Sequence, residues 1–276
     1  MIEISDLTFG YSKKEKLFDK LNLNMSLGRV YGLLGRNGAG KTSLIMQTAG
    51  LLFPDSGKVF IDKNISFRRS KEFLSTFFFV PEEFKIPNVK KDSFVKIYSP
   101  FYENFDSNLF DELLEKFSLS GDKKISDMSY GQKKKFMISF GLACKTKVLI
   151  MDEPTNGLDI PSKMIFRNII DSLKNENNLF IISTHQIRDI EQIIDNIVIL
   201  ESGSIKFNNT VDEVLKRFNF RTSEKNQITE NTVFSQEIPG GYSVIDKNKS
   251  GMKTEFDAEV FFNSVISSPS ILKYFD

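Results

Sequence analysis

The segment GRNGAGKT, from Gly35 to Thr42, has the residue types and spacing of a loop that binds phosphate. Its glycines allow a tight turn in which successive backbone N–H groups surround phosphate oxygens. The helix expected to begin near Lys41 directs its positive end at the same anion. We expect Lys41 to contact the β- and γ-phosphates of a nucleotide and the Thr42 hydroxyl to bind Mg²⁺. The alternative, an ordinary glycine-rich turn, would match these positions by chance in about one such chain in a hundred. The residues expected to bind the nucleotide here are Gly35, Asn37, Gly38, Ala39, Gly40, Lys41, Thr42 and Ser43.

Two carboxylates follow an apolar run much later in the chain. Val148 to Met151 are apolar, and Asp152 and Glu153 come directly after them. If this run is a strand of a parallel sheet, Asp152 lies at the carboxyl edge beside the phosphate loop. Asp152 is then suited to hold Mg²⁺, directly or through water, and Glu153 to polarise an attacking water molecule. Without the phosphate loop, the same pattern would fit equally well a strand that runs out into solvent.

Short apolar runs alternate with longer mixed stretches, a pattern typical of strands and helices in turn. Near-continuous apolarity in such short runs fits strands that helices cover on both faces. The strands predicted to be buried are 30–34, 77–80, 148–151, 179–182 and 197–200. The amino-terminal runs 2–9, 21–27 and 59–61 alternate more strongly, which favours an antiparallel arrangement, and the turn residues 54–57 predict a hairpin or bend before Lys58.

These patterns predict an α/β fold: a P-loop NTPase core, an antiparallel β subdomain and an inserted α-helical subdomain. The main domain is expected to span residues 1–221, with the helical subdomain at about 84–140 and a helix over 107–117. Residues 222–276 are interpreted as a small accessory module, with a strand over 242–246 and a helix over about 257–267. Because the core of such a module would be small, a partly disordered tail is the alternative.

Composition limits the partners and the compartment. Among 276 residues, 37 Lys and Arg face 36 Asp and Glu, so the net charge of +1 gives no reason to expect nucleic acid as a partner. The one cysteine, Cys144, excludes an internal disulfide and a multi-cysteine zinc site, and its apolar surroundings favour burial. No basic segment followed by an apolar stretch precedes the first strand pattern, so we do not expect a secretory signal. No window reaches the roughly 18–20 apolar residues of a membrane span. We therefore expect a cytoplasmic chain whose contact with a membrane runs through a partner.

Further segments narrow the interpretation, because from about residue 2 to residue 218 the chain resembles the ATP-binding cassette (ABC) family of transporter ATPases. The segments occur in the order of that family. They are Tyr11, at the place of its adenine-stacking aromatic; Pro81-Glu82, at its Q-loop; MSYGQ at 128–132, similar to its LSGGQ signature; EPT at 153–155 and NGLD at 156–159, similar to its Walker B extension and D-loop; and Thr184-His185, at its switch histidine.

The resemblance implies that the chain binds Mg·ATP, hydrolyses it and forms a head-to-tail dimer with two shared sites. In the family, the signature contacts the γ-phosphate held by the opposite subunit, which assigns Ser129, Gly131 and Gln132 to that role. From the residues alone, Ser129 and Gln132 have the spacing of a capping box and would be only a helix cap.

The catalytic residues expected are Glu153, His185 and Lys41. His185 is the only histidine. A lone histidine is more often structural than catalytic, but this one follows a predicted strand, at whose end it can reach a γ-phosphate. Tyr11 could equally be a core residue. We interpret Lys133 to Lys135 as a solvated helix face without a role.

Two positions depart from the family pattern. Tyr130 replaces the first glycine of the signature pair and could crowd the approach to ATP. Glu82 replaces the usual glutamine of the Q-loop, so the metal contact there would come from a carboxylate. We expect weaker or differently tuned hydrolysis.

Three non-transport ABC classes do not fit, since the chain lacks long coiled coils, zinc cysteines and a second cassette. The stretch 98–106 and residues 123–129 are similar to the subfamily that serves ABC-2-type exporters. The resemblance therefore implies export through a separate transmembrane permease. That partner would hold the chain on the inner face of the cell membrane, with residues 84–105 of the chain facing it. A surface loop with core aromatics is the alternative for this segment. A soluble ABC ATPase that regulates or remodels a cytosolic target is the alternative function, and the transported substrate is not written in this chain.

Overall fold

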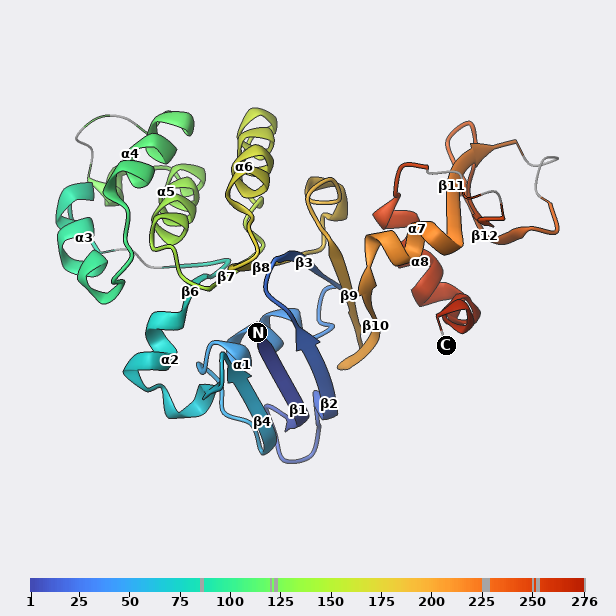
Figure 1. Cartoon of the computed structure of the whole chain (residues 1–276), viewed down its shortest axis with the longest axis horizontal. Coiled ribbons are helices and arrows are strands. Elements are labelled where there is room, and N and C mark those ends of the chain that lie inside the picture. Colours follow the sequence, from blue (N-terminus) through green and yellow to red (C-terminus); the bar gives the residue numbers. More distant parts are fainter. Residues whose placement is uncertain are drawn as a thin grey trace.

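The computed structural model describes residues 1–84, 87–119, 121, 124–224, 229–249, 251 and 254–275. Its centre is a six-stranded sheet in the order β10-β9-β3-β8-β7-β6 (Figure 1). All neighbouring strands run parallel except β10, which pairs antiparallel with β9 at one edge. The strands are β3 (Arg29–Leu34), β6 (Phe77–Val80), β7 (Val148–Asp152), β8 (Leu179–Thr184), β9 (Asn196–Glu201) and β10 (Ser204–Thr210). The five strands predicted as buried are confirmed within two residues at each end.

Alternate residues of the central strands enter two separate hydrophobic cores. Leu149 and Met151 of β7 join one core, while Val148 and Ile150 join the other. Because successive side chains of a strand point to opposite faces, this division means that the sheet is covered on both sides. Figure 1 shows α5 (Tyr130–Ala143) and α6 (Ile160–Leu173) over one face, and α1 (Lys41–Thr48) with a second sheet over the other.

The second sheet is antiparallel, in the order β2-β1-β4-β5, as the amino-terminal alternation predicts. Its strands are β1 (Ile2–Phe9), β2 (Phe18–Met25), β4 (Ser56–Ile61) and β5 (Asn64–Ile65). Strand β4 begins at the predicted bend, where Gly57 has φ +88° and an added Cβ would lie 2.4 Å from the Asp6 carbonyl oxygen. Only glycine fits this approach of β4 to β1.

The inserted helices lie between β6 and β7. They are α3 (Lys91–Tyr98), α4 (Ser107–Lys116), which confirms the predicted helix at 107–117, and α5. Their core is aromatic: the Phe94, Phe110 and Phe136 rings all pack edge-on against one another or against Phe140. The short helix α2 (Lys71–Thr76) precedes β6.

The carboxyl-terminal part forms a three-stranded antiparallel sheet, β11-β13-β12, followed by a helix. Its elements are α7 (Val211–Arg217), β11 (Phe218–Ser223), β12 (Thr232–Ile238), β13 (Gly241–Lys247) and α8 (Ala258–Ser267). The predicted strand and helix correspond to β13 and α8, whereas β11 and β12 were not predicted, and β11 crosses residue 221. Phe261 of α8 packs against Phe207 of β10, with ring centroids 5.0 Å apart, so the described part of this module shares its core with the main domain.

Candidate nucleotide site

Three neighbouring strands end together at one edge of the central sheet. Strand β8 lies between β3 and β7, and the register pairs Leu34 with Thr184 and Ser183 with Asp152. The phosphate loop leaves β3 directly after Leu34, so this register brings it beside the two carboxylates that end β7. The edge opens into a pocket of about 580 Å³. Its lining residues are Tyr11, Leu17, Asn37, Gly38, Gly40, Lys41, Thr42, Ser43, Glu82, Glu153 and His185.

The loop itself presents backbone to this pocket. Gly38 has φ +81°, and a Cβ built there would meet no atom within 4 Å, so the loop is open on that side. Gly40, with φ +107°, is the N-cap of α1, whose first residue is Lys41. The free N–H groups of this helix end therefore face an open space suited to an anion.

Two expected residues of the loop, Gly35 and Ala39, do not line the pocket. A Cβ on Gly35 would lie 2.5 Å from the Leu200 carbonyl oxygen, so this glycine serves the close approach of the loop to β9.

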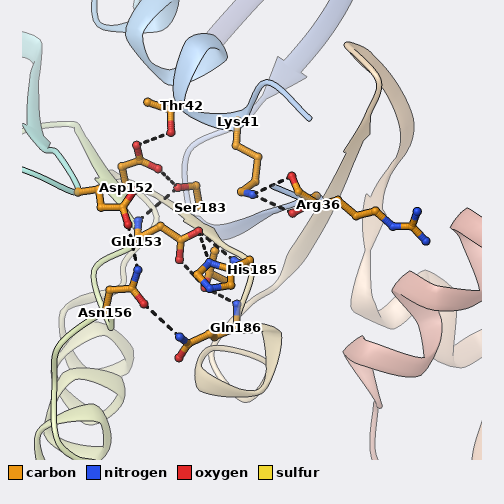
Figure 2. Close-up of polar contacts among 12 residues, drawn as sticks. Arg36, Lys41, Thr42, Asp152, Glu153, Asn156, Ser183, His185 and Gln186 are labelled. Atoms are coloured by element: carbon orange, nitrogen blue, oxygen red, sulfur yellow. Dashed lines mark hydrogen bonds and ion pairs between the residues drawn. The ribbon is translucent and has the colours of Figure 1, made fainter. Parts of the chain in front are cut away.

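Lys41 is buried and folded back onto its own loop. Its ammonium donates hydrogen bonds to the carbonyl oxygens of Gly35, at 2.8 Å, and Arg36, at 3.3 Å (Figure 2). Burial lowers the pKa of Lys41, and the carboxylates of Glu153 and Asp152 act in the opposite direction. The ammonium of Lys41 is thus held by two neutral acceptors, which the charged oxygens of a phosphate can replace.

Thr42, which lines the pocket, contacts Asp152 at the end of β7. The Thr42 hydroxyl donates to Asp152 Oδ2 at 2.8 Å, and the Ser183 hydroxyl donates to Asp152 Oδ1 (Figure 2). The sequence did not mark Ser183, although its place two residues before His185 puts it at the end of the same strand. Among the described residues, no cluster of three or more His, Cys, Asp or Glu side chains could hold a metal alone. A metal at Thr42 and Asp152 therefore needs further oxygen ligands.

Glu153 and His185 form a polar pair that lines the pocket. Glu153 Oε1 lies 2.8 Å from His185 Nδ1 and accepts the His185 backbone N–H at 3.0 Å. The Thr184 hydroxyl donates to Oε2 at 3.1 Å. Glu153 is buried and has φ +46°, an unfavourable backbone conformation for a non-glycine residue. Buried strain of this kind clusters at functional sites.

Tyr11 lies at the rim of the pocket and is not a core residue, since 71% of its surface is exposed. Its ring packs edge-on against Phe9, and its hydroxyl lies 2.8 Å from Ser43 Oγ. An exposed, fixed aromatic ring at this rim is suited to stack on a base.

Glu82 follows β6 and is one of the residues that line the pocket. Its Oε1 accepts a hydrogen bond from Asn156 Nδ2 at 3.0 Å, and Asn156 Oδ1 accepts one from Gln186 Nε2 at 3.1 Å. Figure 2 shows Asn156 and Gln186 side by side next to the Glu153–His185 pair. Sequence reasoning gave neither of these two amides a role.

The expected signature residues lie outside the pocket of their own chain. The capping box is confirmed: Ser129 Oγ accepts the Gln132 N–H at 3.3 Å, and Gln132 Oε1 accepts the Ser129 N–H at 3.0 Å. Gly131 packs against the segment after β7, where an added Cβ would lie 2.6 Å from the Gly157 carbonyl oxygen. Ser129 is exposed, so this helix end is accessible to another molecule.

The interpretation of Lys133 to Lys135 as a solvated face is wrong for the middle residue. Lys134 has no exposed surface, and its ammonium donates hydrogen bonds to two backbone carbonyls after β6. The three consecutive lysines look alike in the sequence. Their burial differs because each side chain leaves the helix in a different direction.

Comparisons with known proteins agree with this geometry. The model of a family described as ABC transporter matches residues 18–156. The bacitracin transport ATP-binding protein BcrA of Bacillus licheniformis is 34% identical over 238 residues, covering 82% of this chain and 76% of that protein. The lantibiotic transport ATP-binding protein SrtF of Streptococcus pyogenes is 31% identical over 207 residues, covering 74% and 89%.

Among solved structures, the dimeric post-hydrolysis state of the ATP-binding cassette MJ0796, bound to ADP and Pi, has a TM-score of 0.67. It is 22% identical and covers 76% of this chain and 99% of that one, which shows a shared fold. The predicted α/β architecture is thereby confirmed. From its family match and its relatives, this chain belongs to the ABC transporter family, in which it is an ATP-binding subunit and an ATPase.

Proposed function

We propose that the chain hydrolyses Mg·ATP as one half of a dimer and uses this cycle to drive export through a separate membrane subunit. The observation that carries the proposal is the meeting of Lys41, Thr42, Asp152, Glu153 and His185 at one sheet edge. The alternative of a soluble regulatory ATPase is not favoured, because the relatives are named as transport proteins.

The donor set fits a magnesium ion bound together with nucleotide. Thr42 and Asp152 supply oxygen ligands 2.8 Å apart, and Glu82 lines the same pocket. Mg²⁺ is usually held by one or two carboxylates, waters and substrate phosphates, which agrees with a site that lacks a full protein cage. When bound, the ion would neutralise charge on the β- and γ-phosphates. A titration of nucleotide turnover with Mg²⁺ and then EDTA tests this assignment, and turnover that persists in EDTA would contradict it.

The remaining roles, phosphate binding, water activation and adenine stacking, would fall to the chain's own residues. Lys41 would exchange its two carbonyl partners for phosphate oxygens, and the N–H groups from Gly38 to Thr42 would bind the same anion. Glu153 would orient the attacking water and accept its proton, with His185 held beside the γ-phosphate position. Tyr11 would stack on the adenine.

We propose that Ser129, Gly131 and Gln132 complete the site of a second copy. In support, these residues form the amino-terminal start of α5, which lies outside the pocket of their own chain, and Ser129 is exposed. MJ0796 is dimeric in its solved structures. The test is the mass of Glu153→Gln in Mg·ATP by light scattering: we expect a dimer, and a monomer at micromolar concentration would contradict the sandwich.

An apolar cavity fits the site for the membrane subunit. Its volume is about 860 Å³, and it lies between α1, α2 and the inserted helices. Phe101, at its edge, is 70% exposed, and neighbouring exposed apolar residues include Leu51, Leu74 and Tyr98. An exposed apolar patch of this kind indicates a protein partner. No described helix is long and apolar enough to cross a membrane, so in our proposal the spans belong to that partner.

Residues 84–105 contribute much of this surface, apart from 85–86, which lie outside the described residues. The exposed Phe101 does not fit the alternative of core aromatics, whereas Phe94 of the same segment is buried. Crosslinking tests the partner: in a Cys144→Ala background, Phe101→Cys should capture a membrane protein, and Lys20→Cys, on the exposed far sheet, should not. Capture of a cytosolic protein instead would favour the regulatory alternative.

We propose the export direction and a peptide-like cargo from the resemblance to the ABC-2 subfamily and from relatives named for bacitracin and lantibiotic transport. Accumulation of a labelled lantibiotic in cells that carry Lys41→Ala, compared with the parent, tests this. Equal accumulation would contradict the cargo and direction together.

We further propose that residues 222–276 form an accessory module that supports the turn after His185. Helix α8 lies against that turn: Glu259 pairs with Arg188 Nε at 2.6 Å, and Ala258 and Ile190 are both fully buried in the shared core. Arg188→Glu should lower turnover, and adding Glu259→Arg should restore it. If the single variants Arg188→Glu and Glu259→Arg both keep the parental turnover, the module does not have this role.

A further inference from the structure

Lys134 is a fully buried lysine that the proposed mechanism does not use. It leaves α5 toward the loop after β6, where its ammonium donates to the Pro81 carbonyl at 3.2 Å and the Glu82 carbonyl at 2.7 Å. It also faces the rings of Phe84 and Tyr130, with centroids 5.4 and 5.6 Å away. Burying a charge costs free energy unless such partners compensate, so this contact is specific and not incidental.

Tyr130 contacts the same loop from the first turn of the helix. Its hydroxyl donates to the Glu82 carbonyl at 2.8 Å, and its ring stacks on Phe84 with a centroid separation of 6.4 Å. One peptide carbonyl thus accepts from two residues of α5. The same residue, Glu82, lines the nucleotide pocket, and its carboxylate accepts a hydrogen bond from Asn156 Nδ2 at 3.0 Å.

We propose that Lys134 and Tyr130 are positioning residues, which clamp the Glu82 backbone so that its carboxylate faces the bound metal and nucleotide. The inference rests on the proposed function, because it assigns Glu82 a role in that site. The inference also goes beyond the proposed function. It assigns to α5, the helix that begins at the signature, the role of setting the position of Glu82.

The charges explain why this cation accompanies a glutamate. Glu82 shares the pocket with Glu153, close to Asp152, and like charges oppose one another. Burial lowers the pKa of Lys134 to about 8, while the carboxylates of Glu82, Asp152 and Glu153 favour its charged form. A buried ammonium on the far side of the Glu82 peptide offsets the added negative charge. The two departures from the family pattern, Tyr130 and Glu82, therefore belong to one arrangement.

The test is a set of variants measured for kcat, KM for ATP and half-saturating Mg²⁺. Lys134→Met keeps the apolar stem and removes the donor, and Tyr130→Phe removes only a hydroxyl. We expect Lys134→Met to lower kcat or raise half-saturating Mg²⁺ by about tenfold or more, with a smaller change for Tyr130→Phe and a small change in KM, as for residues that orient a metal ligand. Lys133→Met, one position along the same helix and without a described side-chain hydrogen bond, is the matched control.

A Glu82→Ala background separates positioning from a structural role. If Lys134 acts through Glu82, Lys134→Met should change neither kcat nor the Mg²⁺ requirement in that background. The proposal is overturned if the effect of Lys134→Met on kcat and half-saturating Mg²⁺ adds fully to that of Glu82→Ala. It is also overturned if Lys134→Met alone keeps the parental kcat and half-saturating Mg²⁺. If Lys134→Met unfolds, Tyr130→Phe in both backgrounds decides the same question. Failure of the proposed function is distinct, because it would appear as an active Glu153→Gln variant.

Discussion

Glu153 Oε1 fixes His185 at two points, the ring nitrogen Nδ1 at 2.8 Å and the backbone N–H at 3.0 Å. The contact joins the residue after β7 to the residue after β8, and these strands are neighbours in the sheet. Glu153 is buried, and Thr184 donates a hydrogen bond to its other carboxylate oxygen, so both oxygens of this carboxylate have partners at the ends of these strands.

Replacing this carboxylate should separate chemistry from binding. Glu153→Gln keeps the shape and removes the base, so we expect kcat to fall by about 10²–10⁴-fold while ATP affinity changes little. Phosphate release and fluorescent-nucleotide binding measure the two quantities. His185→Ala should lower kcat in the same direction. Parental turnover in Glu153→Gln would show that another group activates the water.

Lys41 should contribute mainly to nucleotide affinity. Since a hydrogen bond to a charged group contributes about 1.5–3 kcal/mol, Lys41→Ala should weaken ATP binding by about 10–100-fold, with a further loss of turnover. Arg36→Ala is the control, because that side chain leaves the same loop but points away from the pocket (Figure 2). Equal affinities of the Lys41 and Arg36 variants would contradict the proposed grip on the phosphates.

Position 131 should not tolerate a side chain as small as the methyl group of alanine. A Cβ there would lie 2.6 Å from the Gly157 carbonyl oxygen, and that oxygen belongs to backbone, which cannot swing aside. We expect Gly131→Ala to lower the free energy of unfolding by about 1–3 kcal/mol and to reduce turnover, since the start of α5 must shift. Denaturant unfolding measures this, with Lys133→Ala on the same helix as control. A variant as stable and active as the parent would refute the tight contact.

The thiol of Cys144 should be unreactive in the folded protein. Burial raises its pKa, so at pH 7–9 the thiol stays protonated and lacks the thiolate that attacks disulfide reagents. Native protein should therefore react with Ellman's reagent far more slowly than protein in guanidinium chloride. Fast stoichiometric labelling under native conditions would be the contrary result.

Patterns that are local along the chain determined much of this protein. Glycine spacing and the strand before it identified the phosphate loop, continuous apolar runs located the central strands, and the spacing of Ser129 and Gln132 located the start of α5. Such signals depend on turn chemistry and periodicity within a few residues, which the sequence carries openly. Strand β12 was not predicted because none of its residues is buried, and β11 because only two apolar residues, Phe218 and Phe220, alternate in it.

Only the tertiary structure decided which of several similar residues reach the site. Lys134 is buried and Lys133 is not, although they are neighbours of the same type, because the helix turns one of them toward a loop some fifty residues earlier in the chain. Ser183 and Asn156 likewise acquire their contacts from strand order and register. The sequence thus determined the chemistry available, and packing between distant segments decided its geometry, because contact energies depend on positions in space and not on separation along the chain.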